Sequence, residues 1–262
     1  MSRAPSALAD WPELARQIGG RRLVVFLDFD GTLSPIVENP EDAAILPASR
    51  AAVERLARRV PVVVVSGRGR EDVAARVGLP GLVYAGSHGF DIAGPGVRHE
   101  VGPELPPLIA RATERLEDEL AAVPGAQVEP KRYTVAVHYR RVAPGDEAAV
   151  EAAVDSVVAA HPELRRAGGK KVWEVRPRLD WDKGKALLYL LDALDLAGPG
   201  VLPLYVGDDV TDEDAFRALA ERPGGGVGIR VADEPAQTAA TWRLDSTGEV
   251  PELLERLLSL VP

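Results

Sequence analysis

The sequence predicts an α/β fold, in which a doubly wound parallel sheet is interrupted by a smaller inserted α/β domain. Short β-branched apolar runs alternate with helical periodicities through residues 1–101 and again through 180–262, which is typical of a parallel sheet covered by helices. Acidic or polar residues follow several of these runs. Between 102 and 179 there is about one helix per pair of strands, and no carboxylate follows a strand. We therefore expect a core of 1–101 and 180–262 with an insertion at 102–179.

The elements of the first core segment follow from apolar runs and from the residues that end them. Strand 23–28 begins with four apolar residues, strand 62–65 is four valines, and Gly78 ends a short helix. The expected elements, in order, are helix 7–18, strand 23–28, helix 47–59, strand 62–65, helix 71–77, strand 82–85 and a hairpin containing Ile92 and Val97.

The insertion and the second core segment are interpreted in the same way. The insertion is expected to contain helix 106–123, strands 128–129 and 133–139, helix 147–160 and strand 171–175. The core then resumes with helix 183–194, strand 202–206, helix 214–221, strand 227–231, strand 240–244 and helix 251–260.

Length and composition exclude several classes of protein. A chain of 262 residues suits one large domain or two modest ones. A net charge of −9 argues against a nucleic-acid partner, and the absence of cysteine excludes disulfides and thiolate chemistry. No apolar run is long enough to span a membrane, and the N-terminus lacks the features of a signal peptide. We expect a monomeric cytoplasmic protein.

Asp28 and Asp30 are the most informative residues of the chain. They lie two residues apart where strand 23–28 ends, and Gly31 follows them. Ligands of an open parallel sheet bind beyond the carboxyl ends of its strands, and unpaired buried carboxylates are costly, so this pair indicates a bound cation. The alternative is an ordinary Asp-Gly turn with a helix cap at Thr32.

Three further segments carry charged or polar groups in comparable places. Asp208 and Asp209 end the strand at 202–206, with Asp212 following in the next turn. Ser66, Gly67 and Arg68 end strand 62–65 and suit an anion, although Arg68 could instead support the acidic loop. Lys183 opens a helix, where its charge opposes the helix dipole, so a negative group is expected nearby.

Together the four segments resemble the haloacid dehalogenase (HAD) superfamily of phosphotransferases. They match its D-x-D-G-T, S-G-R, K-G and G-D-D-x-x-D motifs in order. The resemblance implies a HAD-like core with an inserted α/β cap of type C2, in which the core performs the chemistry and the cap selects the substrate.

The insertion and its borders resemble the trehalose-6-phosphate phosphatase family. The segments are G-x-H-G at 86–89, E-x-K at 129–131, H-Y-R at 138–140 and E-x-R-P at 174–177. This resemblance implies a phosphoric monoester hydrolase that releases trehalose and phosphate, the final step of trehalose biosynthesis. The alternatives are a phosphatase acting on sucrose phosphate or a mannosyl phosphate, a phosphomutase, or a catalytically silent phosphatase-like binding module.

The resemblance also implies roles for core residues. Asp28 would form an aspartyl-phosphate, and Asp30 would act as general acid and then as general base. Asp28, the carbonyl group of Asp30 and Asp208 would bind Mg²⁺, whose ligands are hard oxygens, while Asp209 and Asp212 would support the ion indirectly. The phosphoryl oxygens would be held by Ser66, Gly67, Arg68 and Lys183.

Substrate recognition is expected to depend on polar residues of the insertion and its border. They are His88, Glu129, Lys131, His138, Arg140, Lys171 and Glu174. His88 could instead be a structural hinge residue, His138 could lie on a solvated strand face, and Glu129 with Lys131 could be a surface pair. Lys170 and Lys171 alternate along a strand, so only one of them is expected to face the substrate.

Overall fold

A computed structural model describes residues 3–169 and 171–261. The chain divides into two compact units. The core unit comprises Met1–His99 and Trp181–Pro262, and the inserted unit comprises Glu100–Asp180. Lys170, one of the two lysines of which one is expected to face the substrate, lies outside the described residues.

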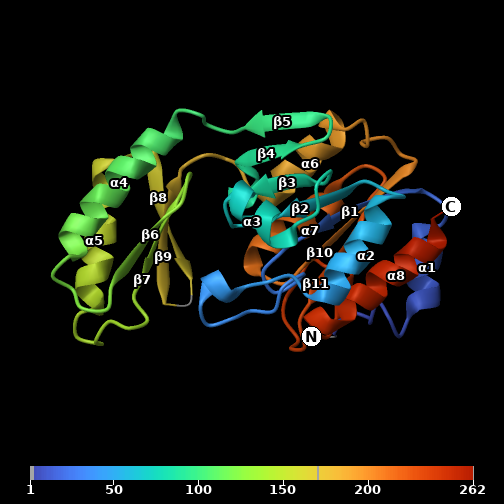
Figure 1. Cartoon of the computed structure of the whole chain (residues 1–262), viewed down its shortest axis with the longest axis horizontal. Helices are drawn as coiled ribbons and strands as arrows, with labels where there is room; N and C mark the ends of the chain where they lie inside the picture. Colours follow the sequence, from blue (N-terminus) through green and yellow to red (C-terminus); the bar gives the residue numbers. More distant parts are fainter. Residues whose placement is uncertain (1–2, 170, 262) are drawn as a thin grey trace. The chain divides into compact units, whose positions relative to one another are not determined.

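The core unit is built on an eight-stranded sheet in the order β12-β11-β10-β1-β2-β3-β4-β5 (Figure 1). Neighbouring strands from β12 to β3 are parallel, and β4 is antiparallel to β3. The strands are β1 (Arg22–Leu27), β2 (Val62–Val65), β3 (Val83–Gly86), β4 (Asp91–Gly94), β5 (Val97–Glu100), β10 (Val201–Gly207), β11 (Val227–Val231) and β12 (Trp242–Leu244).

Helices cover both faces of this sheet because successive side chains of its buried strands point to opposite sides. In β1, Val25 and Leu27 pack in one apolar cluster, whereas Val24 and Phe26 pack in the other. The first cluster includes α1 (Trp11–Ile18), α2 (Pro47–Ala57), α3 (Arg70–Val77) and α8 (Val250–Leu260), and the second includes α6 (Lys183–Ala193) and α7 (Glu213–Glu221). The predicted doubly wound α/β fold is confirmed.

The strand register brings three segments of the sequence to one edge of the sheet. In β1, Leu27 is paired with Val206 of β10 on one side and with Val64 of β2 on the other. These strands are parallel, so their carboxyl ends all face the same way. The acidic segment after β1, the Ser-Gly-Arg segment after β2 and the acidic segment after β10 therefore begin side by side.

The inserted unit has an antiparallel sheet in the order β6-β7-β9-β8, with two helices on one face. Val135 and Val137 are buried on the helix side, which leaves the alternating residues of the same strands on the opposite face. The elements are α4 (Leu105–Leu120), β6 (Gln127–Pro130), β7 (Val135–His138), α5 (Glu147–Ala160), β8 (Leu164–Gly169) and β9 (Val172–Pro177).

Two elements differ from the sequence-based expectation. Helix α1 begins at Trp11 rather than at residue 7, with Pro12 in its first turn. Strand β8 was not predicted, because its sequence contains two arginines and two glycines and lacks apolar alternation. Its place at the edge of the sheet explains this composition, since an edge strand gains much of its order from pairing with one neighbour.

Among residues 3–169 and 171–261, no helix is both long and apolar enough to cross a membrane.

Candidate active site

The ammonium group of Lys183 joins two parts of the acidic edge of the core unit. Its Nζ lies 2.7 Å from Oδ1 of Asp28 and 2.7 Å from Oδ1 of Asp212. Lys183 is only 3% exposed, and it stands at the start of α6, where Asp182 accepts a hydrogen bond from the Lys185 amide. Burial alone would lower the pKa of Lys183, but the charges of Asp212 and Asp28 raise it above its ordinary value.

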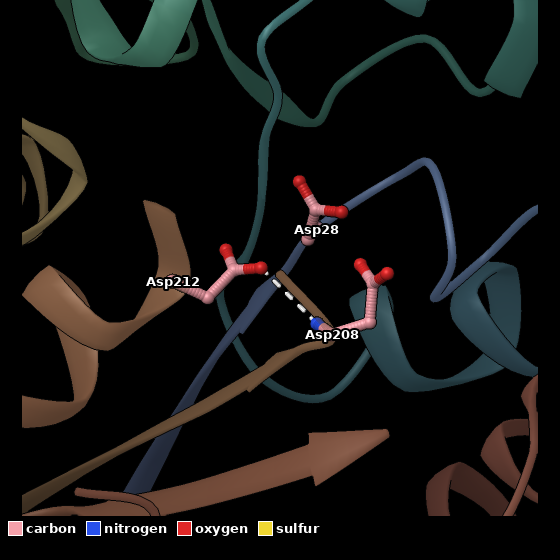
Figure 2. Close-up of side chains that lie close together, drawn as sticks. All are labelled: Asp28, Asp208 and Asp212. Atoms are coloured by element: carbon pink, nitrogen blue, oxygen red, sulfur yellow. Dashed lines mark hydrogen bonds between the residues drawn. The ribbon is translucent and has the colours of Figure 1, made fainter. Parts of the chain in front are cut away.

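Asp212 is fully buried, and both of its carboxylate oxygens accept hydrogen bonds. Oδ2 accepts from the amides of Asp208 at 3.1 Å and Asp209 at 3.0 Å, the first of which is dashed in Figure 2. Oδ1 accepts from Lys183 and from the Tyr205 hydroxyl at 2.6 Å. This carboxylate therefore fixes the backbone that carries Asp208.

Asp209 has a different role from its two neighbours. Its side chain accepts a hydrogen bond from the Val210 amide at 2.6 Å and caps the short 3₁₀ helix η3 (Val210–Asp212). Asp209 is exposed, whereas Asp212 is buried. In this segment Asp209 therefore caps the helix, Asp212 holds the backbone in place, and the side chain of Asp208 is left for another role.

Asp28, Asp208 and Asp212 could together hold a metal ion. Each offers one carboxylate oxygen, and these oxygens lie within 4.8 Å of one another (Figure 2). Burial, together with the negative charge of Asp212 and Asp209, raises the pKa of Asp208 to about 7. Burial likewise raises the pKa of Asp28 well above its usual range, with Lys183 opposing the shift. The cluster has more negative charge than its surroundings neutralise.

The local geometry fits a cation bound by oxygen ligands. Asp208 Oδ1 is buried and accepts no hydrogen bond within the described part of the chain, which leaves it available as a ligand. Gly31 adopts a φ of +78°, and a β-carbon there would lie 2.0 Å from Oδ2 of Asp208. Only glycine at this position permits the close approach of the two acidic segments.

Arg68 lies against Asp30. Its Nε donates to Oδ2 of Asp30 and its Nη2 to Oδ1, both at 2.7 Å. Burial opposes the charge on the guanidinium, but the hydrogen bonds to Asp30 and Asp72 hold the pKa of Arg68 above its ordinary value. The structure thus brings the Ser-Gly-Arg segment to the D-x-D segment through this pair.

The segment containing His88 folds over the Ser-Gly-Arg segment. The amide of His88 donates to the Ser66 carbonyl at 2.8 Å, and the Ser87 amide donates to the Arg68 carbonyl at 2.7 Å. Ser87 and His88 have φ values of 50° and 58°, a conformation costing about 1–3 kcal/mol for each residue. A β-carbon on Gly67 would lie 2.8 Å from Cε1 of His88, so this glycine allows the imidazole to pack there.

Three of the expected recognition residues lie together in the inserted unit. His138 Nε2 lies 2.8 Å from Oε2 of Glu129, and Lys131 Nζ lies 3.9 Å from the same oxygen. Glu129 and His138 occupy the sheet face opposite Val128 and Val137, which are paired with each other. All three side chains are partly exposed, so they form a polar group on the open face.

The other expected recognition residues are separate from this group or differ in environment. Glu174 is half-buried on the same sheet face and lies 4.0 Å from Arg176. Lys171 has a φ of 62° and binds Glu147 of α5 at 2.7 Å. Arg140 is exposed, immediately after β7 and Tyr139.

Sequence reasoning missed Tyr205. Its hydroxyl is buried against Asp212, and burial together with the nearby carboxylates raises its pKa well above the ordinary value. The available signal was a single hydroxyl in the otherwise apolar strand β10, three residues before Asp208.

The comparisons with known proteins agree with this geometry. The trehalose-phosphatase family matches residues 26–248. The chain is 44% identical to a probable trehalose-phosphate phosphatase D of Arabidopsis thaliana, with 98% of this chain and 73% of the relative covered. It is 46% identical to a trehalose-phosphate phosphatase of Mycobacterium avium (strain 104), covering 98% and 67%. The structure of Aspergillus fumigatus trehalose-6-phosphate phosphatase has a TM-score of 0.69 and 28% identity, covering 98% and 99%.

The doubly wound core, the charged groups at its strand ends and the matched relatives together define a phosphatase. The similarity over nearly the whole of this chain identifies the family of phosphatases to which it belongs. The chain belongs to the trehalose-phosphatase family, which confirms the resemblance identified from its motifs.

Replacing Asp208 should have two opposite effects on stability, one through the charge of the acidic cluster and one through the loss of a metal ligand. At a pH above about 7, where Asp208 is ionised, Asp208→Asn removes one negative charge, so the metal-free protein should melt a few degrees higher than wild type. Mg²⁺ at a hundredfold excess over its dissociation constant should add about 2.7 kcal/mol to the wild-type stability and much less to the variant. Thermal melting with and without chelator measures both effects.

Asp214→Asn is the matched control, because Asp214 pairs with Arg217 on α7. It should keep the wild-type response to Mg²⁺. A wild-type Mg²⁺ response in Asp208→Asn would show that Asp208 is not a ligand of the cation.

Proposed function

We propose that this protein hydrolyses trehalose 6-phosphate to trehalose and inorganic phosphate through an aspartyl-phosphate on Asp28. The main support is the buried ion pair between Lys183 and Asp28, a residue of the acidic cluster, in a member of the trehalose-phosphatase family. A nucleophilic carboxylate, a buried ammonium group and oxygen ligands for a cation are the parts that phosphoryl transfer needs.

In the first step Asp28 attacks phosphorus. A bond forms between a carboxylate oxygen of Asp28 and phosphorus, and the bond from phosphorus to O6 of the sugar breaks. Lys183 binds Oδ1 of Asp28 at 2.7 Å, which fixes the carboxylate and leaves Oδ2 as the attacking atom. Asp30 transfers a proton to the departing sugar oxygen, which leaves as a neutral hydroxyl group.

In the second step a water molecule hydrolyses the aspartyl-phosphate. Asp30, now a carboxylate, removes a proton from the water as its oxygen bonds to phosphorus, and the bond to Asp28 breaks. Phosphate leaves, and both carboxylates regain their starting protonation. Asp30 suits both roles because its side chain is 36% exposed, so it meets solvent, whereas Asp28 is buried.

We propose Mg²⁺ as the cation, held by Asp28, the carbonyl group of Asp30 and Asp208. Asp212 would orient this set through its hydrogen bonds to the Asp208 amide and Lys183, and Asp209 would support it by capping η3. The all-oxygen donors suit a hard divalent ion, which when bound neutralises charge on the phosphoryl group. Ser66, Gly67 and Lys183 would hold the phosphoryl oxygens.

The remaining alternatives differ in substrate or in having no activity. A sucrose-phosphate or mannosyl-phosphate phosphatase would share the core residues, whereas a silent module would need none of them. The buried Lys183 favours an active enzyme, because a binding module has no requirement for the costly burial of an ammonium group with two carboxylates.

A substrate panel tests the proposed function. With Mg²⁺ present, phosphate release should be fastest from trehalose 6-phosphate and much slower from sucrose phosphate, mannosyl phosphates and glucose 6-phosphate. A preference for sucrose phosphate would contradict the substrate assignment, and inactivity on the whole panel would favour the silent module.

Asp28→Asn should abolish turnover while the protein stays folded. An amide cannot form the acyl phosphate, and loss of a nucleophile lowers kcat by several orders of magnitude. Phosphate release and thermal melting are measured on one preparation, with Asp42→Asn as the control because Asp42 is exposed. Retention of more than about a hundredth of the wild-type rate would exclude covalent catalysis by Asp28.

We further propose that residues 102–179 form a cap that selects the sugar. The support is chemical. Glu129, Lys131 and Glu174 offer charged groups, and His138 an imidazole, on or beside the open face of the inserted sheet. Sites built for hydroxyl groups discriminate strongly between sugars. His88, Arg140 and Lys171 are proposed to contribute further contacts.

Glu129→Ala or Glu174→Ala should lower kcat/KM for trehalose 6-phosphate by roughly ten- to a thousandfold, because charged hydrogen bonds to sugar hydroxyls are lost. Hydrolysis of p-nitrophenyl phosphate, which has no sugar, should change little. Glu119→Ala on α4 is the control, because Glu119 binds Arg115 on the same helix and Ser156 on α5. Equal losses on both substrates would show that these glutamates do not act on the sugar.

A further inference from the structure

Arg68 is held more firmly than a surface ion pair requires. Its guanidinium donates to Asp30, to the Pro40 carbonyl at 3.0 Å and to Asp72 at 3.3 Å, and it lies 5.5 Å from the centre of the Phe29 ring. Its side chain is 13% exposed. Such a group keeps one position, because moving it breaks several contacts at once.

The backbone of Arg68 is fixed as well. Its amide donates to Ser66 Oγ at 3.1 Å, and its carbonyl accepts from the Ser87 amide. Arg68 follows β2, and Asp30 follows the neighbouring parallel strand β1. The sheet therefore sets the distance between the two residues, and the loop contacts set the direction of the guanidinium.

The bidentate contact fixes the plane of the Asp30 carboxyl group. Nε and Nη2 each bind a different oxygen at 2.7 Å, a fork geometry that a lysine cannot reproduce. Each carboxylate oxygen keeps a second lone pair, so Asp30 remains able to exchange a proton on its open side. These donors are already used, which argues against Arg68 as a primary ligand of the phosphoryl group.

We propose that Arg68 is a positioning residue for Asp30, which aims this carboxyl group at the leaving oxygen. The inference rests on the proposed role of Asp30 as general acid. Loss of Arg68 should therefore lower kcat/KM most for substrates whose leaving oxygen must be protonated as it departs. A residue that binds the phosphoryl group would act on all phosphate esters alike.

The experiment compares kcat/KM for trehalose 6-phosphate, phenyl phosphate and p-nitrophenyl phosphate. For substrates of this kind kcat/KM reports transfer of the phosphoryl group to Asp28, before the hydrolysis step that all of them share. The p-nitrophenolate ion leaves readily without a proton, whereas the sugar alkoxide does not.

Asp30→Ala is the reference, and it should lower kcat/KM for trehalose 6-phosphate by roughly a hundred- to ten-thousandfold and for p-nitrophenyl phosphate far less. Arg68→Met should reproduce this selectivity, with a loss of roughly ten- to a hundredfold on the sugar substrate and below about threefold on p-nitrophenyl phosphate. Phenyl phosphate should fall between them. The double variant should be no slower than Asp30→Ala alone, because both changes remove one function.

Two further variants test whether the effect of Arg68 comes from its geometry, from its charge alone or from a general loss of structure. Arg68→Lys keeps the charge without the fork and should resemble Arg68→Met, so full activity of Arg68→Lys would overturn the inference. Arg76→Met is the structural control. Arg76 is similarly buried and binds Asp72 and the Ala43 carbonyl, and its loss should leave all three substrates at wild-type rates.

The outcomes distinguish the inference from the function on which it rests. Equal losses of Arg68→Met on all three substrates, with Asp30→Ala selective, would overturn the inference alone and assign Arg68 to the phosphoryl group. Unselective losses in Asp30→Ala itself would overturn the general-acid role of Asp30, and the positioning role of Arg68 with it.

Discussion

The buried ammonium group of Lys183 is the interaction on which the acidic edge of the core unit depends. It binds Asp28, 155 residues earlier, and Asp212, 29 residues later, so three distant segments meet at one atom. Removing one partner of a buried ion pair costs about 3–5 kcal/mol, because the remaining charge is left without compensation. The pairing of β1 with β10 and the start of α6 must therefore be correct together for this edge to form.

The same interaction leaves the cluster incompletely neutralised. With Asp28, Asp208 and Asp212 ionised, Lys183 leaves a formal charge of −2 within a few ångströms. Asp212 spreads its charge over two amides, a hydroxyl group and the ammonium group, whereas Asp208 Oδ1 has no comparable donor among the described residues. The negative charge is thus concentrated where Asp28 and Asp208 face each other, which explains why a divalent cation suits this place.

The sequence was sufficient to predict the fold class and the edge at which the polar segments gather, because carboxyl ends of parallel strands must lie together. It was not sufficient to decide which side chain turns inward. Asp209 and Asp212 are equally acidic, and only the geometry of η3 makes one a cap and the other a buried anchor. The partner of Arg68 was open for the same reason, since a guanidinium after β2 can bind either a phosphate group or the acidic segment after β1. Tyr205 was missed because an aromatic residue in a buried strand usually indicates packing.

The two units differ in how freely their polar residues can change. In the core unit Asp28, Lys183 and Asp212 depend on one another across three segments, so replacing Lys183 would leave two buried carboxylates without their shared cation. In the inserted unit, Glu129 and His138 are hydrogen-bonded across neighbouring strands on a partly exposed face, where water competes for the contact and it contributes little to stability. Their replacement changes the surface offered to a ligand at little cost to the apolar layer beneath, which contains Val135 and Val137. A fold of this kind can keep one phosphoryl-transfer site and vary its sugar, because the residues of the inserted unit that are proposed to bind the sugar do not hold the site together.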